Sequence, residues 1–354
     1  MKRPRPISIL ACWLTLTATA AAQVQLLPPP GAPTPLVTSK PAAKPKAKPP
    51  AAKKPAAPVA TPKPPEATVT PAPVPDDPNI DLVYGAYQRG MYKTAFDLAT
   101  QRAKEKGDPK AMTMLGELYS NAMGVRLDYG KAIEWYQRAS DAGDREAMFA
   151  LAMLRLSGRG GPVDHEKAVK LLASSAKLGN PKAAYNLALL YLDGQTLPQD
   201  VNRAAELLRV AADAGNPEAQ YALATFYKEG TGVEKNPEKS VRLLQAASLA
   251  DNVDAEVEYA IALYNGTGTP KNEAAAVALL RKAAKQNSPI AQNRLATVLV
   301  SRPDVADKIE GLKWHLVAKT AGKGDPMLDA ALQDLAPEDR AKAQAGARKW
   351  LGTK

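Results

Sequence analysis

Small and large apolar residues recur along this chain at an interval of 36 residues. An alanine opens each period, a large apolar residue follows four positions later, and a glycine or a second alanine comes next. The opening alanines are Ala111, Ala147, Ala183, Ala219, Ala255 and Ala291. Two sets of small residues on either side of a large one let neighbouring helices approach closely. Each period therefore predicts a helix with a closely packed, buried face.

A turn and a second helix follow in each period. Two columns, meaning residues at the same place in successive periods, hold glycine, which reaches positive φ at little cost and so ends a helix and shapes a loop. The first column is Gly158, Gly194, Gly230 and Gly266, and the second is Gly124, Gly160, Gly232 and Gly268. A polar residue then follows as the expected N-cap of the second helix, at Asp128, Asp164, Asp200, Asn236 and Asn272.

The periods are joined by a helix stop and a helix start, as in Gly179-Asn180-Pro181 and Gly215-Asn216-Pro217. Two helices per period, with no useful stretch of strand-like alternation, predict an all-α fold: an α/α superhelical solenoid of two-helix repeats. We expect an opening helix pair over 80–107, capping helices over 326–354, and repeats over 80–325 as a whole. The individual repeats are predicted to begin at 108, 144, 180, 216, 252 and 288.

The first 22 residues are typical of a secretory signal peptide. Lys2, Arg3 and Arg5 precede a short apolar stretch, and Ala20-Ala21-Ala22 supply the small residues of a cleavage site before Gln23. The apolar stretch is shorter than the roughly 20 residues of a membrane-spanning helix. An uncleaved anchor and a lipidated Cys12 are the alternatives. Cleavage predicts a periplasmic or secreted protein.

Residues 23–79 form a Pro/Ala/Lys-rich segment with 18 prolines, too many for helix or sheet, and with few bulky apolar residues. We predict a disordered tether that acts as a spacer, or that contacts anionic envelope polymers weakly through its lysines. The net charge of +11 divides into +3 for residues 1–22, +4 for the tether and +4 for the remainder. The folded part is therefore not expected to bind nucleic acid.

The sequence offers no arrangement typical of a catalytic, cofactor or metal site. His165 and His315 stand in different repeats with no cysteine or second histidine nearby, and Cys12 is the only cysteine. We expect His165 to be a solvated residue beside its cap and His315 to be a packed one. The stretch 158–161 resembles a phosphate-binding loop but falls in the turn columns and lacks a following Gly-Lys. We therefore predict that the chain is not an enzyme.

The period beginning at Ala111 carries the motif in its fullest form, with Leu115-Gly116, Tyr119, Gly124-Val125, Asp128, Lys131-Ala132 and Trp135-Tyr136. This motif closely resembles the Sel-one-like repeat family, a relative of the tetratricopeptide repeats, over about residues 80–322. Arg155 departs from the aromatic column. Arg302-Pro303-Asp304 replaces the glycine turn in the last period, which is one residue shorter, so that Asp307 aligns with Asp128. The loop there is not expected to follow the family's geometry.

The resemblance implies an adaptor that presents a concave face to a protein or peptide partner, and for envelope members a part in signalling or exopolysaccharide regulation. The alternatives are a cell-wall-associated structural protein and, as in the cysteine-rich members of the family, an enzyme that handles β-lactams. The absence of cysteine from the mature chain argues against the enzyme. Transferring the concave face of tetratricopeptide-like units to this chain gives candidate partner-binding residues at Phe149, Met153, Leu156, Tyr185, Leu189, Leu192, Tyr221, Thr225 and Lys228.

Overall fold

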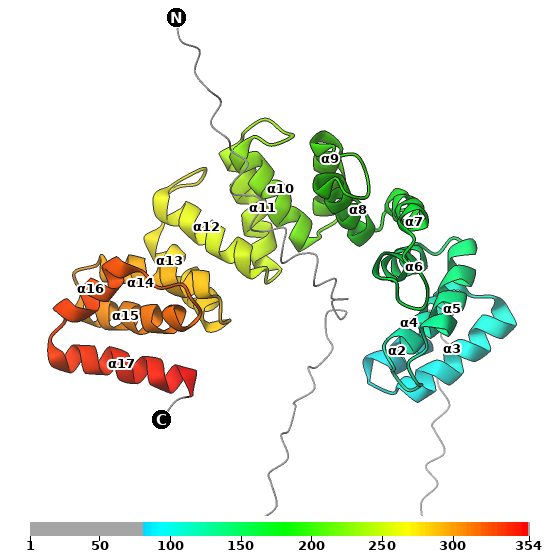
Figure 1. Ribbon diagram of the computed structural model, residues 1–354, viewed down its shortest axis with the longest axis horizontal. Coiled ribbons are helices and arrows are strands. Elements are labelled where there is room, and N and C mark those ends of the chain that lie inside the picture. The colour runs from blue at the N-terminus through cyan, green and yellow to red at the C-terminus, as the bar shows by residue number, and fades with distance from the viewer. Residues whose placement is uncertain (1–80, 353–354) are drawn as a thin grey trace, which may run out of the picture.

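The computed structural model describes residues 81–352, which form an arch of α-helices (Figure 1). Within these residues there are sixteen helices and no strand, so the predicted all-α solenoid is confirmed. The predicted signal peptide over 1–22 and the predicted tether over 23–79 lie outside the described residues. No helix in the described range is both long enough and apolar enough to cross a membrane.

Consecutive helices pack against each other in pairs, and the pairs follow one another at the 36-residue interval of the sequence. In chain order the helices are α2 (Leu82–Gln88), α3 (Tyr92–Lys106), α4 (Pro109–Ser120), α5 (Tyr129–Asp141), α6 (Arg145–Ser157), α7 (His165–Lys177), α8 (Pro181–Asp193), α9 (Val201–Asp213), α10 (Pro217–Glu229), α11 (Pro237–Leu249), α12 (Val253–Asn265), α13 (Glu273–Lys285), α14 (Pro289–Val300), α15 (Val305–Thr320), α16 (Pro326–Asp334) and α17 (Pro337–Leu351).

The helices begin and end at the capping residues marked in the sequence. Asp128 accepts a hydrogen bond from the backbone N–H of Lys131 at 2.9 Å, and the caps of α7, α9, α11 and α13 repeat this bond. The first glycine column lies at the C-caps of α6, α8, α10 and α12, each with left-handed backbone. These caps satisfy backbone groups that helix ends leave without partners.

The second glycine column makes the contact between successive repeats. Gly232 has a φ of 63°, and a Cβ at this position would lie 2.8 Å from the carbonyl oxygen of Val201, the first residue of α9. The loops before α5, α7 and α13 approach the preceding repeat in the same way, through Gly124, Gly160 and Gly268. In the loop before α9 the corresponding position of the column is Thr196, whose hydroxyl lies 3.5 Å from Nδ1 of His165. The column therefore sets how closely one repeat can sit on the next.

Three residues other than glycine have positive φ within 81–352: Ala122, Asp251 and Asn287, at 56°, 59° and 62°. Asp251 and Asn287 continue the column of Gly179 and Gly215 at the ends of the second helices. Asp and Asn tolerate the left-handed region better than most residues, so these substitutions preserve the turn. Ala122 replaces the first glycine column in the first repeat, and its side chain makes this conformation strained.

The repeat that begins at 288 departs from the others in its loop, as expected. The α15 helix begins at Val305, is capped by Asp304, and has 16 residues against 13 in each of the second helices from α5 to α13. The cap Asp304 therefore lies three residues before Asp307, which holds the position aligned with the cap Asp128. Proline at 303 forces an extended turn, so the chain re-enters a helix one turn earlier than the alignment implies.

The opening alanines are all buried at the contacts between helices. The first repeat compensates for a larger neighbour: Tyr136 stands where the later repeats have Leu172, Leu208, Leu244 and Leu280. A Cβ at Gly116 would lie 2.6 Å from the Tyr136 ring. Glycine is therefore needed here, whereas Ala152 and its later counterparts fit beside leucine.

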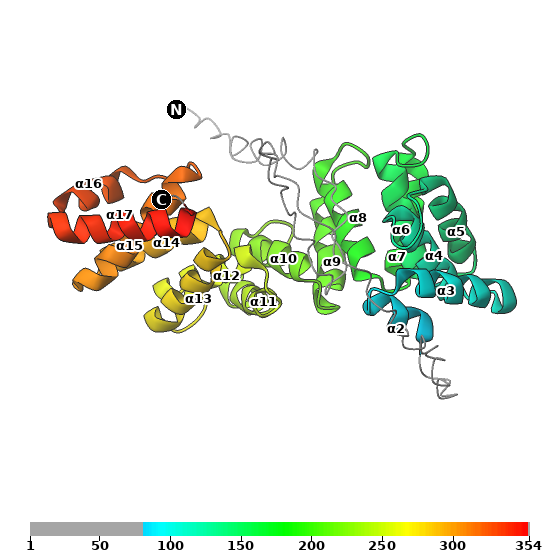
Figure 2. The same cartoon turned by 90° about the horizontal axis from the view of Figure 1, so that it is seen from below.

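The C-terminal end of the arch is covered by α17, which lies along α15 (Figure 2). The rings of Trp314 and Trp350 meet edge to face at a centroid distance of 4.9 Å, and Lys313 Nζ lies 4.1 Å from the Trp314 centroid. His315 occupies the leucine column, is fully buried, and has Nε2 2.8 Å from Oδ1 of Asp329 in α16. His315 is therefore the packed residue that the sequence predicted.

Candidate binding face

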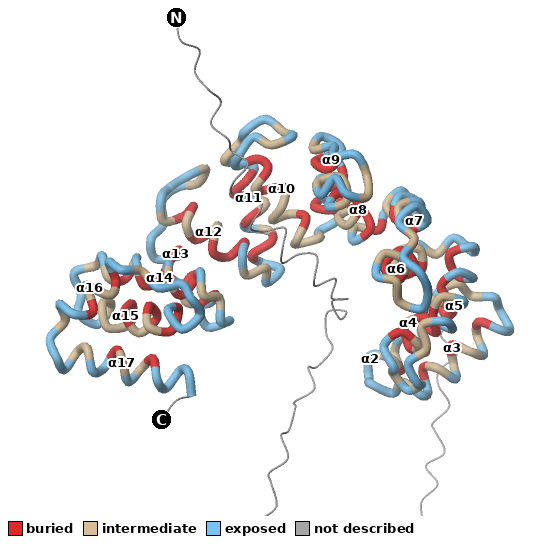
Figure 3. Tube along the Cα trace, viewed as in Figure 1, coloured by how far each residue is buried: buried red, intermediate tan, exposed pale blue. Residues whose placement is uncertain are grey.

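The inner side of the arch is built by the first helices of the repeats. In the N-terminal half, α4, α6 and α8 lie toward the inside, and α5, α7 and α9 lie outside (Figure 1). Buried residues line the contacts between these helices, whereas the loops are largely exposed (Figure 3). We define the first-helix face by three columns at helical spacings of three and four. It comprises Lys110, Glu146, Lys182, Glu218 and Asp254; Thr113, Phe149, Tyr185 and Tyr221; and Glu117, Met153, Leu189 and Thr225.

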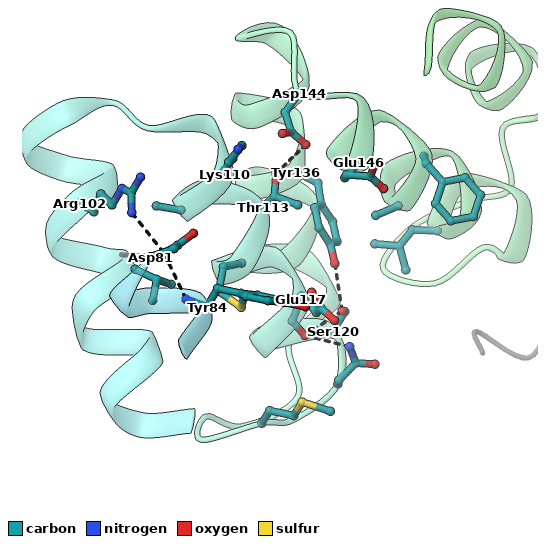
Figure 4. A pocket seen from close by; sticks show the side chains of 18 of the residues that line it. Asp81, Tyr84, Arg102, Lys110, Thr113, Glu117, Ser120, Tyr136, Asp144 and Glu146 are labelled. Atoms are coloured by element: carbon teal, nitrogen blue, oxygen red, sulfur yellow. Dashed lines mark hydrogen bonds and ion pairs between the residues drawn. The ribbon is translucent and has the colours of Figure 1, made fainter. Parts of the chain in front are cut away.

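A cavity of about 450 Å³ hollows the N-terminal end of this face (Figure 4). Residues of α2, α4 and α6 form most of its wall, and Lys182 contributes from α8. Its apolar wall includes Val83, Met114, Met123, Phe149 and Leu154. Asp81, the first described residue, also lines it, so the N-terminal segment joins the fold at the cavity rim.

Glu117 is one of several charged residues that line the cavity, and it lies on α4. The Tyr87 hydroxyl donates to Glu117 Oε1 at 2.8 Å. Burial raises the pKa of Glu117, although the hydrogen bond from Tyr87 and the charge of Lys182 act in the opposite direction. Nearby, the hydroxyls of Ser120 and Tyr136 share a hydrogen bond of 3.3 Å. The cavity thus combines apolar walls with charged side chains, among them the half-buried carboxyl groups of Glu117 and Asp144.

Farther along the face, aromatic rings alternate with carboxylates. Burial raises the pKa of Tyr185, and the charge of Glu218 raises it further. The pKa of Tyr221 is raised to about 12, mainly by burial. The negative charges of Asp254, Glu258 and Glu229 raise it further. The pairs Tyr185 with Glu218 and Tyr221 with Asp254 have the same separation in sequence, so the repeat itself generates this pattern.

The nine candidate residues differ in how much surface they offer. Phe149 lines the cavity. Leu189 is 38% exposed, whereas Met153 is only 7% exposed and offers little surface to a partner. Lys228 is exposed and pairs with Glu258 at 2.7 Å. The remaining five are half-buried: Leu156, Tyr185, Leu192, Tyr221 and Thr225. Their role in partner binding stays a prediction for all nine.

The polar part of the cavity was not among the predicted residues. Glu117 stands in the column of Met153 and Leu189, so the same register leads to it once the first repeat is included. Tyr87 lies in α2, before the first full repeat, where no column argument reaches. The polar group and its partner thus come from the part of the chain with the weakest repeat signal.

Within residues 81–352 no group of three or more His, Cys, Asp or Glu side chains is placed to hold a metal ion. His165 is exposed at the start of α7, and His315 is buried beside α16. The stretch 158–161 forms the turn between α6 and α7.

Comparison with known proteins agrees with this architecture. The family model described as "Sel1 repeat" matches residues 109–144, 145–180, 181–216, 217–252 and 253–288, together just over half of the chain. No curated protein matches the chain significantly.

Among solved structures, a protective antigen present in uropathogenic Escherichia coli strains, which displays an SLR fold, superimposes with a TM-score of 0.65 and 26% identity. The match covers 77% of this chain and 59% of that one, so this chain spans less than two thirds of its length. A Sel1 repeat protein from Oxalobacter formigenes gives a TM-score of 0.53 at 23% identity, over 61% of this chain and 86% of that one, and shows the same fold.

Proposed function

Because this chain belongs to the Sel1 repeat family, we propose that it is a non-catalytic scaffold that binds a protein or peptide along its first-helix face. The Sel1 repeat fold in general suggests a protein–protein interaction scaffold, and proteins of this family are generally non-enzymatic. The proposal for this chain adds the position of the site and the chemistry of its contacts.

The single observation that supports this site best is the cavity at α2, α4 and α6. Partner side chains that anchor an interface enter desolvated pockets with apolar walls and few polar groups. Phe149, Met114 and Leu154 offer such walls, and Glu117 offers a carboxyl group for orientation. Leu189 and Tyr185 continue the apolar surface along α8, which gives the extended contact that a peptide or helix requires.

The proposal also places this scaffold in the cell envelope, in the periplasm or outside the cell. The charged start, apolar stretch and small residues of positions 1–22 support this location, as does the signal cleavage that we expect before Gln23. Regulation of signalling or of exopolysaccharide is the role that the family resemblance favours. Edman sequencing of the mature chain from a periplasmic fraction would test the location, and an N-terminus at Met1 would contradict it.

Partner capture from an envelope extract tests the binding face. Leu189→Asp places a charge on this face, and Val210→Asp, at a residue 51% exposed in α9 of the same repeat, is the matched control. We expect both variants to keep the wild-type circular dichroism spectrum, and only Leu189→Asp to lose the captured protein. Equal capture by wild type and Leu189→Asp would mean that this part of the face does not bind the partner.

A further inference from the structure

The proposed function leaves open what covers the first-helix face before a partner arrives. An aromatic stripe runs along this face from Phe149 in the cavity to Tyr185 and Tyr221 beyond it, and the charges of Glu218 and Asp254 lie near Tyr185 and Tyr221 respectively. Aromatic grooves are the usual binding sites of proline-rich segments, because proline rings stack on aromatic side chains at a low cost in conformational entropy. Any ligand that combines proline with positive charge would therefore match this surface on two counts.

The carboxylates near Tyr221 are poorly compensated by the rest of the fold. Four acidic residues of α10 and α12 lie close to the two tyrosines: Glu218 near Tyr185, and Asp254, Glu258 and Glu229 near Tyr221. Only Glu258 forms an ion pair with another of the described residues, through Lys228. The surface therefore has an excess of negative charge where the aromatic stripe continues, which favours a cationic ligand.

The chain itself supplies a segment of this chemistry. Residues 40–63 contain seven lysines, from Lys40 to Lys63, set among prolines and alanines, and no acidic residue. The same chain enters the fold at Asp81, on the rim of the cavity. The chain thus enters the fold at the end of the first-helix face that holds the cavity, and both the prolines and the charge of residues 40–63 complement that face.

The connection is long enough to reach the acidic part of the face. Lys63 precedes Asp81 by 18 residues, and at roughly 3.1 Å per residue in an extended proline-rich chain this spans about 55 Å. Consecutive packed helices lie about 8–10 Å apart, so the eight steps from α4 to α12 amount to at most about 80 Å. Lys54 and Lys53 lie farther back in the segment, and at the same rise the chain from Lys54 to Asp81 spans about 84 Å, which reaches α12. A connection of this length also holds the lysines near the face at an effective concentration in the millimolar range.

We propose that residues 40–63 bind the first-helix face of their own molecule, with lysines beside Glu218 and Asp254 and prolines against Tyr185 and Tyr221. The segment then occupies the site at which the proposed partner binds, and the partner must displace it. This inference rests on the proposed function only for its regulatory consequence. The contact itself exists or fails independently of any partner.

A carbodiimide, which joins a lysine amine to a carboxylate only when the two are in direct contact, tests the contact in the full-length mature protein. Unlabelled and ¹⁵N-labelled chains are mixed before reaction, and the linked tryptic peptides are identified by mass spectrometry. We expect links from lysines 40–63 to Glu218 and Asp254 within one isotopic species at low salt. At about 1 M salt, where the Debye length falls to about 3 Å, these links should be lost.

Matched double variants complete the test. Glu218→Gln with Asp254→Asn should lower the linking of the segment to the remaining carboxylates near Tyr221, Glu229 and Glu258, about fivefold, the scale of two partly exposed ion pairs. Glu134→Gln with Asp213→Asn, at exposed residues of α5 and α9, should leave the yield unchanged. Equal yields in the two variants, links spread evenly over α5 and α9, or links between isotopic species would each overturn the proposal.

The two proposals can fail separately. Capture of the partner, and its loss in Leu189→Asp, is measured without reference to the lysine links. A chain that captures its partner but shows no links has an open binding face, which overturns only the inference about residues 40–63. A chain that shows the links but captures nothing through this face contradicts the proposed function instead.

Discussion

Replacing Gly232 with alanine tests whether the second glycine column sets the spacing between repeats. The change has two effects that the structure separates. Alanine at a φ of 63° is strained, by roughly 1–2 kcal/mol. Its Cβ would also lie 2.8 Å from the carbonyl oxygen of Val201 and 2.9 Å from Val201 Cγ1, in the preceding repeat. The contacted oxygen belongs to the backbone, so it moves only if α9 moves.

Gly215 provides the matched control. Its φ is 83°, and a Cβ there would meet nothing within 4 Å. Gly215→Ala therefore introduces only the backbone strain, and we expect it to lower the free energy of unfolding by about 1 kcal/mol. Gly232→Ala adds a close contact of the kind that overpacking produces, about 1–3 kcal/mol more, so its total should be about 2–4 kcal/mol.

Urea denaturation of the full-length variants, followed by far-ultraviolet circular dichroism, measures this difference. Because a solenoid is stabilised by contacts between neighbouring repeats, the loss in Gly232→Ala should also appear as faster hydrogen exchange in α9 and in the loop before α11. Equal midpoints for the two variants would refute the reasoning, since strain alone would then account for both. The result would also show that the second column could accept alanine.

Three shorter predictions follow. Ala122→Gly should relieve the strain at a φ of 56°, which raises the urea midpoint and increases the free energy of unfolding by about 0.5–1 kcal/mol. Asn287→Gly should increase it less, because Asn tolerates this conformation. A lower midpoint for Ala122→Gly would contradict this. Burial raises the pKa of Glu117 in the folded state, so the folded protein holds this proton more tightly than the unfolded chain does. Stability should therefore fall as pH rises from the unfolded-state pKa to the folded-state pKa of this group. Urea midpoints measured across pH should lose this dependence in Glu117→Gln. Met153→Asp buries a charge and should destabilise the protein by more than about 2 kcal/mol, whereas Leu189→Asp should change its thermal midpoint little.

The repeat explains why so much of the fold could be predicted from the sequence. Caps, glycine turns and buried alanines recur at one interval, so Asp128 and Gly230 each have counterparts that support the same assignment. Where the period breaks, at Arg302-Pro303-Asp304, the sequence predicted only that the loop would differ, and the structure shows that Asp304 caps α15. The cap at Asp304 has no counterpart in the other repeats, so the repeat pattern could not indicate it.

The binding face was predictable only in part. The register of the first helices leads to Phe149 and Leu189, but a single register cannot tell how far a side chain is covered, and Met153 proved to be almost fully buried. The cavity depends on α2, which precedes the first full repeat, where the columns of the repeat do not extend. Tyr87 could therefore be matched to Glu117 only in three dimensions.

The identical junctions Gly179-Asn180-Pro181 and Gly215-Asn216-Pro217 have a consequence for how such a chain changes length. Removing residues 181–216 would place Pro217 directly after Asn180, so the sequence at the junction would remain Gly-Asn-Pro. No new loop would be needed, and Gly232 would then meet the start of α7 in place of the start of α9. Gene duplication or deletion can thus lengthen or shorten this array in whole steps of 36 residues, and each step adds or subtracts one set of contact positions while the two ends stay capped.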